Sequence, residues 1–435
     1  MTDETEQTDE TEPTDETEPS GQSEESTRPP ADENAVRLYG EEFDQRPKDF
    51  FERMRREHGP VVPVLLEGDI PAWYVIGYRE VNHVTGNPAL FARDTRRWNA
   101  WDMVPENWSL LPFVGWNPSV MLAEGEEHHR RSAAISDALD AVDRTELAGI
   151  CERVADHLID EFAGDGEADL GAQYADRLPP LVMVGLFGVP DAEVPDMIRD
   201  IQDVAGSDEN AVAAYGRLQE TMRRLAETRR ARPGADVTSR LLRHPAGYTD
   251  DELVSDLIPM ISAGHLPTGH WIGNTLRLML VDEQFAVTLQ GGRGSVSQAL
   301  NQVLWEDTPS QNNIGRFAVR SCELAGRRIR PGDMLILGWA AANADPQVAP
   351  PAHGAGAGNR AHLSFGHGDH GCPYPAPELA EVVARTAVEV LLDRLPDMEL
   401  AVKPDELMWL PSFWVRRLAA LPVRFTPALT PHRPL

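Results

Sequence analysis

The sequence predicts a mainly α-helical protein with small peripheral β-sheets. Long stretches with helical hydrophobic periodicity fill the middle of the chain, at Thr145–Phe162, Asn210–Arg230 and Asp250–Leu280. Runs rich in β-branched and apolar residues are short, and they lie towards the two ends of the ordered sequence. No internal repeat occurs outside the first 33 residues. A helical body with a few small sheets at its edge accounts for all three observations.

The N-terminal segment, residues 1–33, is a near-repeat of Thr, Asp, Glu and Pro with no large apolar residue beyond Met1. Such a segment cannot bury enough apolar surface to offset its ordering entropy, so we expect a disordered acidic tail. A solubilising role is the simpler interpretation, and docking to a basic partner is the alternative. Residues 34–435 are expected to form one domain.

The ordered part begins with a short helix and a hairpin. A charged helical pattern covers Pro47–His58, and two β-rich runs, Val61–Leu66 and Ala72–Ile76, flank a Glu-Gly-Asp turn. Short β-rich pieces return at Ile329–Ile336 and Val423–Phe425. The Pro- and Gly-rich stretch 346–360 is expected to be irregular.

Composition excludes several functional classes. A net charge of −30 argues against nucleic acid and anionic membrane surfaces as partners. The most apolar long stretch, Leu257–Val281, contains two His, two Pro and an Arg, so no membrane insertion is expected. The N-terminus has no apolar signal core. Three scattered cysteines (Cys151, Cys322 and Cys372) are too few for a disulfide framework, and we expect a cytoplasmic protein.

The most informative string is the loop His362–Pro373, which contains a lone cysteine. Gly366 and Gly368 permit tight backbone turns ahead of Cys372. A helical pattern, Glu378–Leu395, follows, and a thiolate near a helix N-terminus is stabilised by the dipole and the free amide protons. One thiolate without a second cysteine nearby suits a single-ligand metal cofactor.

Two alternatives for this loop stay open at the level of the residues. One is a zinc site, although structural zinc sites mostly use paired cysteines. The other is a buried cysteine without any redox role. The zinc site would use His362, His367, His370 and Cys372.

The run FGHGDHGC, from Phe365 to Cys372, resembles the haem loop of cytochromes P450, Phe-Gly-x-Gly-x-His-x-Cys, at every defined position. The resemblance extends over roughly residues 36–430. It implies the cytochrome P450 fold and haem b (iron protoporphyrin IX), with Cys372 as the axial ligand of the iron. In that family the thiolate pushes electron density onto iron and favours O–O cleavage.

Three other segments resemble haem-contacting parts of the same family. Arg316, in Gly-Arg-Phe-Ala, and His362 resemble residues that pair the haem propionates, a suitable role for cationic donors. His128 resembles the start of a His-x-x-x-Arg helix that reaches the same groups. The arginine position of that helix is Ser132 here, although arginines occupy the two preceding positions.

The sequence also departs from the family. Gln302 and Trp305 occupy the positions of the usual Glu-x-x-Arg pair, and the third partner falls by spacing near residues 352–353. Replacing such a charged set together can be nearly neutral, whereas removing one member strands a buried charge. The same Gln-x-x-Trp replacement is found in a small bacterial subfamily, which this chain resembles most.

A second departure lies in the central helix. Ala263 and Gly264 resemble the family's residues over the haem, but Leu and Pro, at positions 266 and 267, replace the acid–alcohol pair that delivers protons to dioxygen. Thr268 and His265 are the candidate catalytic substitutes, and His265 has the intrinsic pKa of a shuttle. A pocket role without proton transfer is the alternative for His265.

Three functions follow from the resemblance. The first is a monooxygenase that receives electrons from a ferredoxin and ferredoxin reductase and hydroxylates or oxidatively couples an apolar small molecule. The second is a peroxide-driven peroxygenase, and the third is a non-catalytic haem-binding sensor or partner protein.

Four tryptophans could line a ligand pocket or merely pack a long loop: Trp98, Trp101, Trp108 and Trp116.

Overall fold

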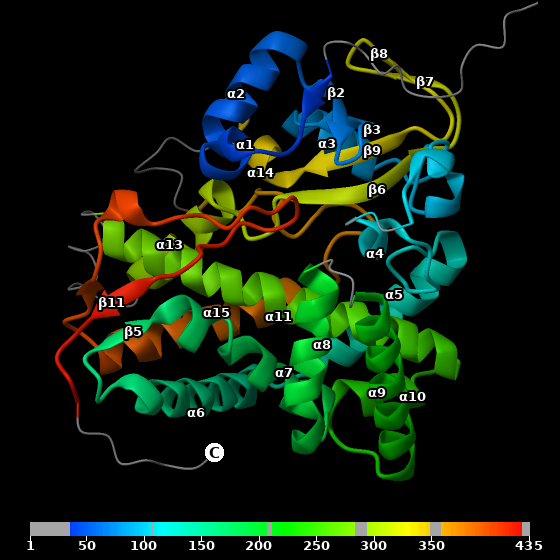
Figure 1. Ribbon diagram of the computed structural model, residues 1–435. Coiled ribbons are helices and arrows are strands. Elements are labelled where there is room, and N and C mark those ends of the chain that lie inside the picture. Colours follow the sequence, from blue (N-terminus) through cyan, green and yellow to red (C-terminus); the bar gives the residue numbers. More distant parts are fainter. Residues whose placement is uncertain are drawn as a thin grey trace, which may run out of the picture.

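The computed structural model describes residues 35–106, 108, 110–206, 211–282, 294–348 and 358–428. The predicted acidic tail therefore lies outside the described residues, as does most of the predicted irregular loop. The fold class is confirmed: a large helical part packs beside one six-stranded sheet and two smaller sheets (Figure 1).

Helices account for most of the described chain. Patterns predicted at 47–58, 145–162, 210–230, 250–280 and 378–395 all fall on helices, and the first of them is matched at both ends. The helices are α1 Glu41–Gln45, α2 Pro47–His58, α3 Tyr78–Thr85, α4 Leu111–Val114, α5 Gly125–Asp140, α6 Arg144–Phe162, α7 Leu178–Phe187, α8 Val194–Gly206, α9 Ala211–Ala231, α10 Val237–Arg243, α11 Asp250–Val281, α13 Gly294–Glu306, α14 Trp339–Asn343 and α15 Ala376–Arg394.

The six-stranded sheet joins distant parts of the sequence. Strands β2 (Val61–Leu66) and β3 (Ile70–Val75) form the predicted hairpin, with residues 68 and 69 at positive φ in its turn. Strand β3 then pairs in parallel with β9 (Met334–Gly338), and β9 pairs with β6 (Asn312–Ala318). The order is β1-β2-β3-β9-β6-β4, with β1 at Val36–Arg37 and β4 at Phe91–Ala92.

Two smaller sheets complete the β-structure. Strands β7 (Cys322–Leu324) and β8 (Arg327–Ile329) form a hairpin. Strand β11 (Pro422–Arg424) joins β10 (Glu399–Leu400) to β5 (Glu167–Asp169). The β-rich run predicted at 329–336 is thus divided between two sheets, because β8 ends at Ile329 and β9 starts five residues later.

Helix α11 runs through the middle of the helical part and contacts α7, α9, α13 and α15 (Figure 1). A capping box at Thr249 and Glu252 fixes its first turn. The middle of α11 carries apolar residues on most of its faces, so one face packs in the helical core while another lines a cavity. No helix among the described residues is long and apolar enough to cross a membrane.

Candidate functional site: a cavity closed by a cysteine loop

The cysteine loop has the tight backbone that its glycines predicted. Gly366 and Gly368 have φ values of 72° and 71°, and the Cys372 amide donates to the Phe365 carbonyl at 2.7 Å. A Cβ on Gly368 would lie 2.3 Å from the carbonyl oxygen of Thr85, in α3. Only glycine satisfies both the dihedral angle and this close approach. The loop is therefore held against α3, and α15 begins four residues after the cysteine.

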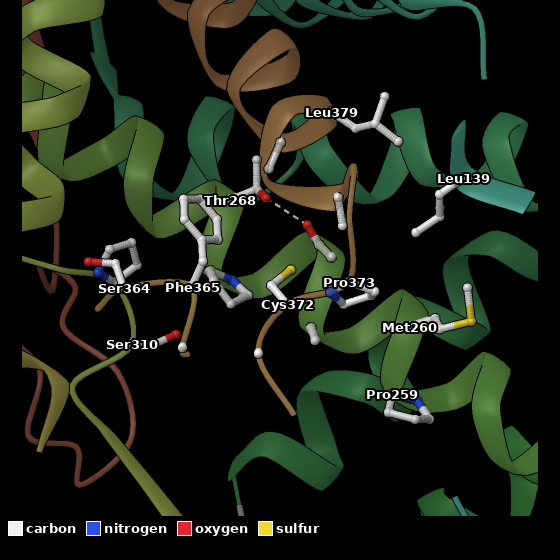
Figure 2. Close-up of a pocket in the computed structure, with 18 of the residues that line it drawn as sticks. Leu139, Pro259, Met260, Thr268, Ser310, Ser364, Phe365, Cys372, Pro373 and Leu379 are labelled. Atoms are coloured by element: carbon white, nitrogen blue, oxygen red, sulfur yellow. Dashed lines mark hydrogen bonds between the residues drawn. The ribbon is translucent and has the colours of Figure 1, made fainter. Parts of the chain in front are cut away.

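Cys372 lines a cavity of about 370 Å³, and Figure 2 shows its sulfur among the side chains that surround this space. The thiol is accessible from the cavity, yet burial within the protein raises its pKa to about 12. The free thiol is therefore protonated at neutral pH, and binding of a metal ion would release its proton. No cluster of metal-ligating residues occurs within the described part of the chain, so the alternative of a zinc site gains no support.

The cavity walls are mostly apolar and come mainly from α5, α7, α11, α15 and the cysteine loop, with single residues from α6, α13 and α14. None of the lining residues is Lys, Arg, Asp or Glu. Polar side chains gather on the side of β6, at Ser310, Asn312 and Asn313. Representative apolar residues are Ile135 and Leu139 from α5, Met183 and Leu186 from α7, Met260 from α11 and Leu379 from α15.

Helix α11 presents Ala263, Gly264 and Thr268 to the cavity. The Thr268 hydroxyl donates to the Gly264 carbonyl at 2.7 Å (Figure 2). A Cβ on Gly264 would lie 2.3 Å from the terminal methyl of Met183, so α7 packs closely here. The helix continues through Pro267, which lines the cavity and has no amide proton to donate to the Ala263 carbonyl.

The structure separates the two predicted proton carriers. Thr268 lies on the cavity, whereas His265 is buried and is absent from the lining residues. The His265 Nδ1 atom lies 3.2 Å from the Ile261 carbonyl, and burial lowers the pKa of the ring to about 4. His265 is therefore neutral at pH 7 and faces its own helix.

Basic side chains gather near His370, which lines the cavity. Arg316, on β6, is buried, and its recorded hydrogen bond runs from Nη1 to the Gly315 carbonyl at 3.4 Å. Burial, with Arg93 nearby, lowers the Arg316 pKa well below its usual value. The rings of His128 and His370 have centroids 4.0 Å apart, and burial lowers the pKa of both. Arg316 and His128 both act on the electrostatics of His370, so they lie in the same region, and their predicted contacts with haem propionates stay a prediction.

Arg93 is the member of this basic group that sequence reasoning missed. It follows β4 and is buried against Gly315, its Nη1 donating to that carbonyl at 3.0 Å. Burial lowers its pKa to about 10. Nothing in its local sequence distinguishes it from the neighbouring arginines at 96 and 97.

His362, at the start of the cysteine loop, lies next to Trp305 of α13. The Trp305 ring is perpendicular to the His362 ring, with centroids 6.0 Å apart, and its Nε1 donates to the Asn359 carbonyl at 2.9 Å. Gln302 donates to Glu306 in its own helix. Trp305 is therefore buried where the family has its arginine, and the hydrogen bond of Gln302 stays within its own helix. The predicted third position falls outside the described residues.

The arginines next to Ser132 are engaged elsewhere. The buried Arg131 pairs with the buried Asp256, its Nε lying 2.9 Å from Oδ2. Arg130 pairs with Glu252. Neither guanidinium belongs to the cavity.

The tryptophan-rich loop is packed rather than ligand-binding. The rings of Trp98, Trp101 and Trp108 contact one another at 5.0 and 5.9 Å and join the core beside the sheet. Trp116 is half-exposed beneath the Arg96 guanidinium. None of the four is among the residues that line the cavity.

A helical fold with an apolar cavity lined by a lone cysteine, and with two arginines near the cavity-lining His370, is typical of a haem-thiolate protein. No protein-family model matches the sequence. It is 30% identical over 397 residues to the cytochrome P450 monooxygenase PikC of Streptomyces venezuelae, an alignment covering 89% of this chain and 92% of that one. It is 28% identical over 383 residues to 2-hydroxy-5-methyl-1-naphthoate 7-hydroxylase of Streptomyces carzinostaticus, covering 85% and 92%.

Solved structures agree. CYP154C4 from a Streptomyces species superposes with a TM-score of 0.81 at 25% identity, covering 90% of this chain and 98% of that one. Myxobacterial CYP267B1, solved with myristic acid, gives 0.78 at 26%, covering 89% and 98%. The chain belongs to the cytochrome P450 family. It is a haem-thiolate monooxygenase, and the peroxygenase and sensor alternatives gain no support.

The residues present fit a haem. Within the described residues, the buried Nδ1 atoms of His128 and His362 have no hydrogen-bond partner, so both can donate to carboxylates. Among the described residues, no carboxylate lies beside the buried Arg316 cation. The apolar walls suit a porphyrin face, and Phe365 packs edge-on against Trp271 with centroids 5.8 Å apart.

Proposed function

We propose that this chain binds haem b through Cys372, receives electrons from a ferredoxin and ferredoxin reductase, and oxidises a neutral, apolar small molecule. The observation that carries the proposal is the Cys372 thiol facing an apolar cavity without a charged side chain in its lining. A charged substrate would lose its hydration there without gaining an ion pair. We place the protein in the cytoplasm, because its three cysteines are free thiols.

Each site residue has a role in this proposal. Cys372 provides the axial ligand, and Phe365, Gly366 and Gly368 shape the loop that holds it. Arg316, His128 and His362 hold the propionates. When bound, the haem supplies the activation of dioxygen, chemistry that no protein side chain performs.

The central helix orients the substrate and handles protons. Ala263 presents a small side chain to the cavity, Gly264 lets Met183 approach the helix, and the apolar walls exclude bulk water. Thr268 holds a proton at Oγ1 next to the cavity and passes it on when it releases the Gly264 carbonyl. We assign this role to Thr268 rather than to His265, which would have to leave the Ile261 carbonyl to reach the cavity.

The electron donor would approach the loop side, where exposed charges are balanced. Glu378 pairs with Arg144 at 2.7 Å, and Glu381 pairs with Arg360 at 2.6 Å. The exposed Tyr374 lies between the cysteine and α15. Oxygen uptake that depends on both NADH-reduced ferredoxin and an apolar substrate would support this part of the proposal. Product formed efficiently with hydrogen peroxide alone, without ferredoxin and without oxygen uptake, would contradict it.

The first test is the carbon monoxide difference spectrum of the reduced protein. We expect the red-shifted Soret band of a thiolate-ligated haem, lost in Cys372→Ser. Cys322→Ser is the matched control, because Cys322 lies in the β7–β8 hairpin away from the cavity lining. A blue-shifted band in the unaltered protein, or no haem at all, would refute the proposal.

A further inference from the structure

We propose that the acidic tail, residues 1–33, binds within the same chain to a basic patch on the β7–β8 hairpin. The tail contains thirteen Asp and Glu residues and one Arg, and it lies outside the described residues. The basic patch consists of four arginines: Arg320, Arg327, Arg328 and Arg330. None of them lines the cavity, so the inference goes beyond the proposed function and does not depend on it.

The basic patch concentrates positive charge in a chain whose net charge is −30. Between positions 320 and 330 the four arginines accompany one carboxylate, Glu323, which lies opposite Arg328 in the hairpin. Among the described residues, Arg320 and Arg327 pair with no carboxylate. Arg320 is exposed, and Arg327 donates from Nη2 to the neutral His58 carbonyl at 3.0 Å. Positive charge therefore remains on this surface, and it attracts an acidic segment.

The first described residues leave the fold next to the basic patch. Strand β1 runs parallel to β2, with Val36 opposite Val64, so the residues before Val36 are directed towards Val61, the first residue of β2. The hairpin lies at this same end of β2, because its apolar side chains share a core cluster with Val61 (Figure 1). The bond from Arg327 to His58, three residues before Val61, fixes the hairpin there.

The nearest acidic residues of the tail have a short distance to span. A strand advances about 3.3 Å per residue, so three residues cover the roughly 10 Å from the level of Val64 to that of Val61. A continuation of the β1 register would bring Glu33 level with Val61, with Asp32 one residue further along the same path. Both carboxylates then reach the surface where Arg327 lies.

Tethering favours the chain's own tail over a second copy or another acidic protein. A segment joined to its binding site by a short flexible connection has an effective concentration in the millimolar range. Each contact between exposed charges is weak, so many carboxylates near few arginines form a contact that salt dissolves. Salt therefore changes the size of the molecule in a direction that depends on whether the tail is bound.

The first test is small-angle X-ray scattering of the full chain between about 20 mM and about 0.5 M salt. A free acidic segment repels itself and contracts as salt rises, whereas a bound one is released and extends. We expect the maximum dimension to increase with salt in the unaltered protein and to decrease in the double variant Arg320→Gln, Arg327→Gln. The matched control Arg199→Gln, Arg223→Gln removes two exposed arginines of α8 and α9 and should behave as the unaltered protein does. A maximum dimension that decreases with salt in the unaltered protein would overturn the inference.

Cross-linking provides an independent check. Carbodiimide joins carboxylates to lysine amines but not to arginine, and the chain contains only two lysines, Lys48 and Lys403. In low salt Arg327→Lys should yield about 10-fold more product joined to residues 1–33 than Arg223→Lys, whose neighbour is Glu220. Equal yields would contradict the proposal. In a mixture of isotope-labelled and unlabelled protein the product should join residues of one chain, and products that join two chains would show binding between copies instead.

Discussion

The buried ion pair between Arg131 and Asp256 offers a sharp test of how the structure supports the cavity. Both side chains have 0% exposure. Asp256 also accepts from the backbone amide of Val120, a cavity-lining residue, at 2.6 Å and from the Tyr248 hydroxyl at 3.0 Å. Asp256→Asn keeps the shape but removes the buried partner of Arg131, which is left with the exposed Glu127 as its remaining carboxylate. Removing one partner of such a pair costs about 3–5 kcal/mol of unfolding free energy.

The assay is urea unfolding of the haem-bound protein, followed by tryptophan fluorescence and by the Soret band. Glu252→Gln is the matched control, since its pair with Arg130 lies one turn earlier on α11 and is partly exposed, so about 1 kcal/mol or less is expected. Replacing Arg131 and Asp256 together by Met and Leu should recover most of the loss. Equal effects of Asp256→Asn and the control would refute the reasoning.

Three further predictions follow from single sites. Gly368→Ala should abolish the thiolate Soret signature, because the new Cβ would lie 2.3 Å from the Thr85 carbonyl oxygen and the residue has a φ of 71°. Gly358→Ala is the control and should leave the signature unchanged, because open space surrounds Gly358. Burial lowers the pKa of His270 to about 3, with smaller contributions from Arg417 and His265. Below pH 6.5 the unfolded chain therefore binds a proton at this residue that the folded chain does not bind. This one group should therefore lower stability by up to about 1.4 kcal/mol per pH unit between pH 6 and 4. In urea titrations His270→Gln should reduce the slope by that share, while the other buried histidines, such as His265 and His362, keep theirs. Thr268→Val should lower product formed per electron by about 100-fold while oxygen uptake continues; unchanged coupling would remove Thr268 from proton delivery.

The sequence predicted the elements whose conformation is determined by residues close together in the chain. Pro47–His58 was predicted to the residue because its apolar positions repeat with the helical period and Gly59 follows it. The hairpin at 61–75 was predicted because its turn residues require positive φ. The cysteine loop was predicted because glycine spacing constrains the backbone directly.

Contacts between distant residues escaped prediction. Arg93 contacts the carbonyl of Gly315, 222 residues further along the chain. The run at 329–336 resembles one hairpin in sequence, yet β9 finds its partners in β3 and β6. His265 could have been excluded from the cavity by helix phase alone. The cavity-lining positions of α11 follow a repeat of three and four residues, and position 265 falls outside it; they are Met260, Ala263, Gly264, Pro267, Thr268 and Trp271.

The pairing of β3 with β9 has a consequence for synthesis. The hairpin of β2 and β3 is almost wholly buried in the finished protein, but its partner strand begins at Met334. At a usual rate of translation the hairpin waits on the order of 10–50 s for that strand, with its apolar faces uncovered. Cys372 emerges later still, so haem capture belongs to the last steps of biogenesis. A chain terminated before that point would present an unpaired apolar edge instead of a cofactor site.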